Sequence, residues 1–268
     1  MVRAQMISVF GAAAAAMAMA VAAQSEAVIN TEGLLALWLC DDEDGDVATD
    51  SSGNGMDAEF KSGGGEWVAG KHGGGLEFFA EGWVETDEPV VVDTKGFTMG
   101  CWAKPGQPQK AFVNIMASHQ EPPQRGISFE QRNQELNVYG FAMGTPQGWT
   151  DCGATFRLNT DEWNFMVRVR DEDGKTAQDY LNGEHILEGV CQNDNPVVAA
   201  TAGFRLANMV VDAAAREWRG VIDEAFVFNR ALSEDEVMSL YDGGWLRALA
   251  VSPKGKLPTT WASMKGAF

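Results

Sequence analysis

Between Gly33 and Arg230 the sequence consists of short apolar runs separated by turn-forming residues, with almost no helical periodicity. Runs that alternate apolar and polar residues predict β-strands, because successive side chains of a strand point to opposite faces. The segments that predict strands are 33–40, 76–84, 97–104, 126–129, 136–141 and 164–170. Many short strands with glycine-rich turns favour an all-β fold, a two-sheet antiparallel sandwich of the jelly-roll type.

The turn signals between these runs are specific. The segment 50–55 (DSSGNG) predicts a tight turn, and Asp173-Gly174 predicts a hairpin tip. Asn182-Gly183 predicts a second hairpin, because both central residues of a type I′ turn need positive φ and these residue types tolerate it.

One short helix is expected after the last strand. Ser233 is a favourable N-cap, and Glu236 stands three residues later, which is the capping-box pattern. Val237 and Leu240 follow at helical spacing, and Gly243 predicts the end of the helix.

The N-terminal segment 1–23 predicts a secretory signal peptide. Arg3 gives a positive start, 7–22 is alanine-rich and apolar, and the small residues at 20–22 fit a cleavage site. A membrane anchor is the alternative, but a span needs about 20 solidly apolar residues and alanine is only weakly apolar. We therefore expect an exported protein that is secreted or held at the cell surface or in the periplasm, with no membrane span after cleavage.

The chain is strongly acidic, with 38 Asp and Glu residues against 20 Lys and Arg residues and a net charge of −18. This charge disfavours nucleic acid as a partner, because the phosphate backbone is also anionic. The sequence predicts one jelly-roll domain at 30–244 and a C-terminal extension at 245–268. Lys254, Lys256 and Lys265 make that extension basic, so it is either a loosely packed tail or an arm on the acidic body.

Four cysteines, Cys40, Cys101, Cys152 and Cys191, permit two disulfides with three possible connectivities. Cys152 and Cys191 both lie in polar, loop-like sequence, so we favour a disulfide between them. Cys40 and Cys101 lie in apolar strands and could equally be buried free thiols. The CxxC spacing of many zinc sites is absent from the sequence.

Six segments in sequence order resemble the LamG-like jelly-roll group of the concanavalin A-like lectin/glucanase superfamily. They are 35–39 before an acidic loop, 50–55 (DSSGNG), 70–84 (GKHGGGLEFFAEGWV), 97–105 (FTMGCWAKP), 180–183 (YLNG) and 220–232 (GVIDEAFVFNRAL). The resemblance implies two antiparallel sheets whose first and last strands lie close together. It also implies a structural calcium ion in many members.

Candidate calcium ligands follow from the resemblance. Ca²⁺ takes about six to eight oxygen ligands, and adjacent first and last strands would bring Asp223 near Asp50 and Asn54. The residues alone are also explained without a metal, because DSSGNG is a common turn sequence. We expect Asp50, Asn54 and Asp223 to hold a calcium ion that stabilises the fold. The secondary candidates are Asp41, Asp42 and Glu224.

Catalysis is not expected. Glycan-cleaving relatives carry two glutamates and an intervening aspartate on one face of a strand, which supplies the two carboxylates of the reaction. The acidic runs 171–173 and 234–236 are explained by a hairpin tip and a helix N-terminus. His72, His119 and His185 lack metal-binding spacing and are interpreted as ordinary surface or packing residues.

Trp149 is the best candidate for sugar binding, because it lies among turn formers at 144–153 and aromatic faces pack against sugar rings. Asn137 and Tyr139 are predicted to line the same cleft. Trp83 and Trp102 lie on strands and are interpreted as core. The alternative for Trp149 is packing in its loop beside a disulfide at Cys152.

The sequence therefore predicts a secreted, non-catalytic binding module for an extracellular glycan or glycoprotein, with calcium as a structural ion. One alternative is a glycan-cleaving hydrolase or lyase of the same superfamily. The other is a structural adhesion or surface component without a small ligand.

Overall fold

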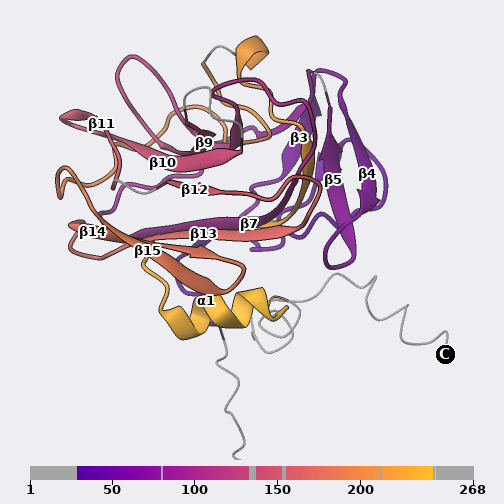
Figure 1. Cartoon of the computed structure of the whole chain (residues 1–268). Coiled ribbons are helices and arrows are strands. Elements are labelled where there is room, and N and C mark those ends of the chain that lie inside the picture. The colour runs from indigo at the N-terminus through magenta and orange to yellow at the C-terminus, as the bar shows by residue number, and fades with distance from the viewer. Residues whose placement is uncertain are drawn as a thin grey trace, which may run out of the picture.

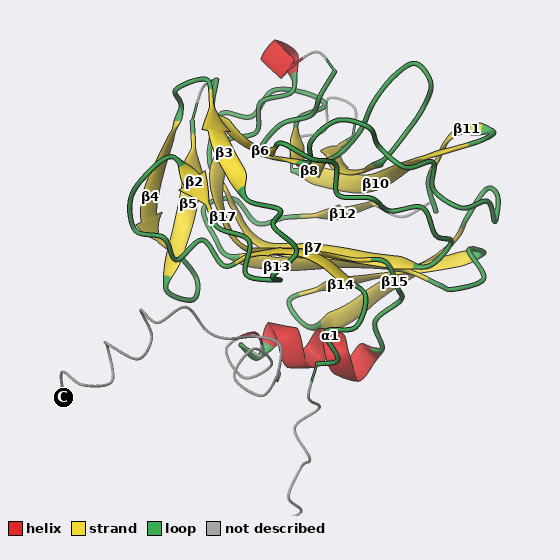
Figure 2. Ribbon diagram, turned by 180° about the vertical axis from the view of Figure 1, so that it is seen from behind, coloured by secondary structure: helices red, strands yellow, loops and turns green. Residues whose placement is uncertain are grey.

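Two layers of antiparallel strands face each other, and one short helix lies below the lower layer (Figures 1 and 2). This computed structural model describes residues 29–79, 81–132, 137–152, 155–211, 213–243 and 245. The predicted signal peptide, and the predicted extension apart from Trp245, lie outside the described residues. The arrangement confirms the prediction of an all-β sandwich with one C-terminal helix.

The lower layer is an eight-stranded sheet. In spatial order it contains β15 (Glu184–Val190), β14 (Thr176–Leu181), β13 (Asn164–Arg170), β7 (Phe97–Pro105), β17 (Gly220–Phe228), β5 (Gly74–Phe78) and β4 (Gly65–Ala69), with β1 (Leu34–Trp38) also paired to β17. The pairing of β1 with β17 places Leu34 opposite Phe228 and Trp38 opposite Ala225. The first and last strands are therefore neighbours, as the resemblance implied.

The upper layer is a nine-stranded sheet. In spatial order it contains β11 (Gly148–Thr150), β10 (Val138–Thr145), β9 (Ile127–Gln131), β8 (Asn114–Ala117), β16 (Arg205–Leu206), β6 (Trp83–Thr86), β3 (Ala58–Lys61) and β2 (Val47–Ala48), with β12 (Thr155–Arg157) also paired to β10. The prediction of one strand over 76–84 is wrong: the segment contributes to β5 and β6, which belong to different sheets. Gly82 lies in the crossing, where any Cβ would stand 2.0 Å from the Gly64 carbonyl oxygen.

The main core lies between the two sheets. Phe129 and Phe141 pack edge to face at 5.6 Å between ring centroids, and Trp38 stacks on Phe204 at 5.5 Å. A second apolar cluster lies on the other face of the eight-stranded sheet, where α1 (Glu234–Tyr241) covers it. Both faces of this sheet are thus covered around its centre, which explains why its central strands carry apolar residues on both faces.

The local signals for α1 are confirmed. Ser233 accepts a hydrogen bond from the Glu236 backbone, and the Glu236 side chain accepts one from the Ser233 backbone. Gly243 ends the helix at φ 83°, and Asn182 and Gly183 have φ of 52° and 80° as a type I′ hairpin requires. A single 3₁₀ turn, η1 (Ala213–Ala215), follows β16.

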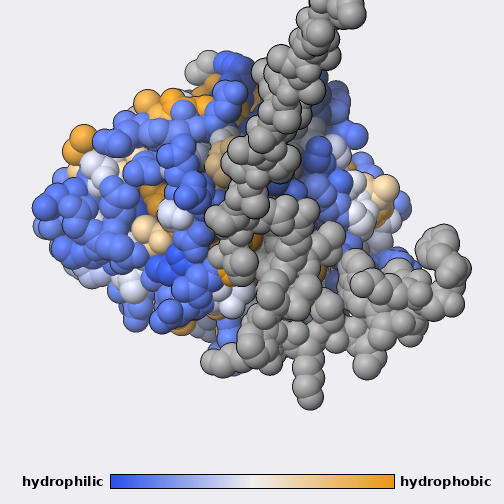
Figure 3. Space-filling view, turned by 90° about the horizontal axis from the view of Figure 1, so that it is seen from below, coloured by the Kyte–Doolittle hydropathy of each residue, from blue (hydrophilic) through white to orange (hydrophobic). Residues whose placement is uncertain are grey.

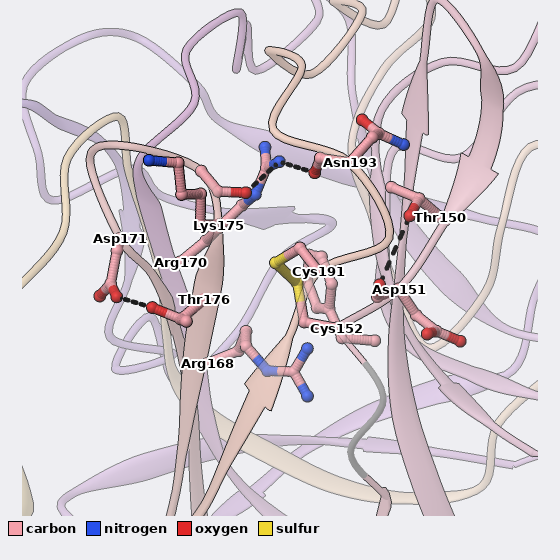
Figure 4. Close-up of a disulfide and its surroundings, with 12 residues drawn as sticks. Thr150, Asp151, Cys152, Arg168, Arg170, Asp171, Lys175, Thr176, Cys191 and Asn193 are labelled. Atoms are coloured by element: carbon pink, nitrogen blue, oxygen red, sulfur yellow. Dashed lines mark hydrogen bonds between the residues drawn. A yellow bond between two sulfur atoms is a disulfide. The ribbon is translucent and has the colours of Figure 1, made fainter.

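The disulfide joins Cys152 to Cys191, which confirms the favoured pairing, and Cys40 and Cys101 are buried free thiols. Cys152 follows β11 and Cys191 follows β15, and these are the end strands of the two sheets. The bond therefore ties the upper layer to the lower layer at one end of the sandwich, as Figure 4 shows in close-up. Nearby, the Arg170 guanidinium donates to the carbonyl oxygens of Asn193 at 3.0 Å and Asn195 at 2.8 Å.

The face on the side of α1 is predominantly hydrophilic where described residues are visible, and its apolar residues form small separate groups (Figure 3). Among the helices of the described part, none is long and apolar enough to cross a membrane.

Candidate functional site

Trp149 lies on the outer face of the nine-stranded sheet. Its strand, β11, pairs with β10 so that Thr150 stands opposite Met143 and Trp149 opposite Gly144. Met143 belongs to the core between the sheets. Because neighbouring residues on a strand point to opposite faces, the Trp149 side chain points away from that core. The indole is only partly buried.

Two side chains from the loop after β8 contact Trp149. The imidazole of His119 packs on the indole with 3.7 Å between ring centroids. Glu121 accepts a hydrogen bond from the Trp149 indole N–H, and the same carboxylate oxygen lies 3.2 Å from His119 Nε2. The three side chains form one cluster, called here the Trp149 cluster.

The members of the Trp149 cluster differ in burial. His119 is 7% exposed, and its Nδ1 is buried without a hydrogen-bond partner. Burial lowers the pKa of His119 to about 4, although Glu121 opposes this shift. The Glu121 side chain is 43% exposed, so its carboxylate can accept hydrogen bonds from a ligand. An aromatic face beside an exposed acceptor suits a sugar ring, which presents apolar C–H groups and hydroxyl donors.

Beside the Trp149 cluster the outer face is charged. Arg132 binds Glu130 at 2.7 Å and donates to the Phe141 carbonyl oxygen at 2.6 Å. Burial raises the pKa of Glu130, and Arg132 opposes that shift. These contacts hold the Arg132 guanidinium in place and make this region a polar surface.

Asn137 and Tyr139 do not join Trp149. Tyr139 is fully buried between the sheets, where its hydroxyl accepts a hydrogen bond of 2.8 Å from the Trp218 indole. Asn137 is 6% exposed and its amide donates to Thr160. Direct ligand contact is incompatible with this burial, so we correct the expectation that they line a cleft with Trp149.

The two tryptophans interpreted as core differ. Trp102 is 2% exposed and packs against Phe165 and Tyr241. Trp83 is only partly buried. The interpretation of Trp83 as a core residue is therefore wrong, because this side chain lies on an outer face of the sandwich.

The predicted calcium ligands Asp50 and Asn54 lie in the expected turn. Asp50 accepts backbone N–H bonds from Leu37, Ser52, Asn54 and Met56 at 2.9–3.1 Å, and its second oxygen also accepts from the Ser52 hydroxyl at 2.7 Å. The Asn54 amide donates to the carbonyl oxygen of Leu34 at 2.8 Å. Both Asp50 oxygens therefore face hydrogen-bond donors, which a cation would have to displace.

Asp223 has a different environment. Its Oδ2 accepts from the backbone N–H groups of Lys71 and His72 at 2.8 and 2.9 Å, whereas its Oδ1 is buried without a partner. Glu224 follows in a β-bulge at φ 44°, and its Oε2 is also buried without a partner. Burial raises the pKa of Asp223 to about 7 and that of Glu224 to about 8, with Asp41 adding to both shifts.

The three predicted metal residues therefore belong to two environments. Hydrogen bonds tie Asp50 and Asn54 to β1 and their own turn, and tie Asp223 to the 71–72 backbone. Among the described residues, no group of three or more His, Cys, Asp or Glu side chains is arranged to hold a metal. Asp50 and Asn54 fit a calcium ion poorly, so the expectation of calcium now depends on the free oxygens at Asp223 and Glu224.

Comparison with known proteins supports the fold. A family model described as concanavalin A-like lectin/glucanases superfamily matches residues 79–238, which is more than half of the chain. No curated protein sequence matches.

Several solved structures are similar. Domain 4 of AbnA, an extracellular GH43 arabinanase from Geobacillus stearothermophilus solved with arabinotriose, has a TM-score of 0.62 and 22% identity over 78% of this chain and 98% of that chain. The binding domain of Paraclostridial Mosquitocidal Protein 1 has a TM-score of 0.62 and 13% identity over 80% of this chain and 52% of that one. A sialidase from Trypanosoma rangeli has a TM-score of 0.54 and 15% identity, covering 80% of this chain and 33% of that one.

Proposed function

Because the chain belongs to the concanavalin A-like lectin/glucanases superfamily, we propose that it is a non-catalytic binding module for an extracellular glycan or the glycan of a glycoprotein. The family contains both binding proteins and enzymes by its description, so membership alone does not select a task. The choice between a binding function and a catalytic one therefore depends on the residues of the candidate site.

The observation that carries the proposal is the Trp149 cluster. The partly exposed indole is fixed on one side by His119 and at its N–H by Glu121. A fixed aromatic side chain loses little conformational entropy on binding. A sugar ring can pack on the remaining indole surface while its hydroxyls donate to the exposed Glu121 carboxylate.

The similar arabinanase domain was solved with arabinotriose. At 22% identity this likeness concerns the fold, so it does not identify the sugar for this chain. It supports including arabinotriose and arabinan in the first set of ligands to test.

The test is binding of the mature chain to a panel of immobilised polysaccharides and oligosaccharides that includes arabinan and arabinotriose. We expect Trp149→Ala to weaken binding at least about tenfold, equivalent to about 1.4 kcal/mol. Trp67→Ala is the matched control, because Trp67 is also partly buried but lies on β4 in the other sheet. Failure to bind any glycan, or equal binding by Trp149→Ala and the wild type, would overturn the proposal.

The non-catalytic part of the proposal is tested separately. Incubation of the chain with each polysaccharide of the panel should release no reducing ends. Release that disappears in Glu130→Gln or Glu121→Gln would instead support the hydrolase alternative, since that reaction needs paired carboxylates.

We also propose that the structural calcium ion implied by the family resemblance binds at Asp223. The support is the pair of unpartnered carboxylate oxygens on Asp223 and Glu224, with Asp41 nearby. A cation there would relieve the repulsion between the Asp223 and Glu224 carboxylates. Asp223→Ala removes the acceptor of the Lys71 and His72 backbone N–H groups in any buffer, so it should lower the melting temperature with and without calcium, and more in calcium than in chelator. An equal loss in calcium and in chelator would contradict this assignment.

Finally, we propose that the protein is exported after removal of the signal peptide. The Cys152–Cys191 disulfide supports an oxidising compartment. N-terminal sequencing of protein recovered outside the cytoplasm should begin near residue 23, whereas an intact Met1 there would contradict cleavage.

A further inference from the structure

We propose that Trp83 forms a second sugar-binding subsite on the same outer face as Trp149, so that the ligand is a polysaccharide long enough to reach both tryptophans. This inference rests on the proposed function and specifies the class of ligand. It concerns a residue whose sequence position suggested a core role.

The register of β6 places Trp83 on the outer face. Val84 and Thr86 are 0% and 2% exposed and point into the space between the sheets. Trp83 and Glu85 alternate with them and therefore point outward. Trp149 also points outward from the nine-stranded sheet, so both indoles lie on the outer face of that sheet.

The surroundings of Trp83 repeat those of Trp149. The Trp83 indole N–H donates to the Glu85 carboxylate at 3.3 Å, as Trp149 donates to Glu121. The Arg205 guanidinium lies over the Trp83 ring at 4.9 Å from its centroid, in the same way that the His119 imidazole packs on the Trp149 ring. Each indole is thus held by a glutamate at its N–H and by a nitrogen-containing side chain at its ring.

Contacts within the protein hold the side chains around Trp83 in place. Arg205 binds Glu85 at 3.0 Å and donates to the Met209 carbonyl oxygen at 2.7 Å, and its side chain is 11% exposed. These contacts fix the cation over the indole. Because the groups need not be ordered on binding, little of the interaction energy is lost to entropy.

The distance between the two tryptophans determines the ligand class. β11 and β6 are separated by five strand-to-strand steps in the sheet order. At about 4.8 Å per step, the two strands lie roughly 24 Å apart. A trisaccharide is too short for this separation, whereas a polysaccharide can contact both tryptophans and gain affinity from simultaneous binding.

The test compares the affinity for a polysaccharide with the affinity for the trisaccharide of the same sugar. Arabinan and arabinotriose are the first pair, and the comparison is repeated for every other polysaccharide that the wild type binds. We expect Trp83→Ala to weaken polysaccharide binding at least about tenfold, because a second contact commonly adds this much avidity. The affinity of the Trp83→Ala variant for the trisaccharide, which binds at Trp149, should differ from that of the wild type by less than about twofold. Trp83→Phe, which keeps a ring, should retain most of the polysaccharide affinity, and thermal unfolding checks that each variant folds.

The two proposals fail in different ways. If Trp149→Ala abolishes binding but Trp83→Ala binds polysaccharide like the wild type, the second subsite is overturned and the proposed function stands. If the wild type binds no glycan, or neither tryptophan matters, the proposed function fails and this inference fails with it.

Discussion

The guanidinium of Arg168 on β13 and the carboxylate of Asp179 on β14 form a two-point ion pair between the sheets, where the side chains are 1% and 0% exposed. The Arg168 guanidinium also lies over the Phe141 ring at 5.3 Å, which comes from the opposite sheet. The pair thus lies in the core between the two sheets.

Removing one partner of this pair should be costly. Arg168→Ala leaves the Asp179 carboxylate buried without a counter-ion, and we expect a loss of about 3–5 kcal/mol in the free energy of unfolding. Replacing both residues with apolar side chains should cost much less. Urea unfolding of the two single variants and the double variant checks this, and additive losses would contradict the coupling.

Breaking the disulfide should destabilise the fold, because the unfolded chain gains conformational entropy when the cross-link is removed. Cys152 and Cys191 are 39 residues apart, and chain-entropy arguments give about 4 kcal/mol for a loop of that length. Cys152→Ser with Cys191→Ser should lower the free energy of unfolding by about 2–4 kcal/mol. A reducing agent should have the same effect on the wild type and no further effect on the double variant.

The contribution of the Asp50 turn to stability should depend on the Asp50 carboxylate and not on calcium. Asp50→Ala removes the acceptor for four backbone N–H groups, and we expect a loss of at least about 2 kcal/mol, because hydrogen bonds to charged groups are among the stronger ones. The loss should be the same in calcium and in chelator. Asp87→Ala, at an 80% exposed side chain, should change stability by less than about 0.5 kcal/mol.

His119 gives a pH prediction. Burial lowers the folded-state pKa of His119 to about 4, from the ordinary histidine value of about 6.5. Between these values the unfolded chain binds a proton at this position and the folded chain does not. Its contribution to stability is therefore present above about pH 6.5 and is lost as the pH falls toward 4, by at most about 1.4 kcal/mol per pH unit.

The check is a comparison of unfolding free energies for the wild type and His119→Gln between pH 4 and pH 7. The wild type should lose more stability than the variant as the pH falls. Parallel curves would show that His119 does not titrate differently in the two states.

The sequence predicted most of the fold because each signal was local. Ser233 and Glu236 form their capping box within one helical turn, and Asn182-Gly183 forms its hairpin between adjacent strands. The assignment of 76–84 to one strand failed for a long-range reason. The crossing between sheets at Gly82 depends on close approach to Gly64, which the order of residues does not reveal.

The candidate site was only partly predictable. Trp149 stood out because its neighbours form a turn, but His119 and Glu121 come from another loop and join it only through folding. The prediction that Tyr139 lines a cleft with Trp149 was wrong, because the inward direction of this side chain depends on the register of β10. Trp83 could have been found, since the alternation with Val84 and Thr86 in WVET places it opposite two inward residues.

The most direct test of the glycan-binding account is a crystal structure of the mature chain with a glycan that it binds. We predict a sugar ring packed on the Trp149 indole, with at least one hydroxyl within hydrogen-bond distance of the Glu121 carboxylate. A sugar bound elsewhere, for example in the largely apolar pocket lined by Met56, Pro89 and Val91, with Trp149 free of ligand, would contradict the account.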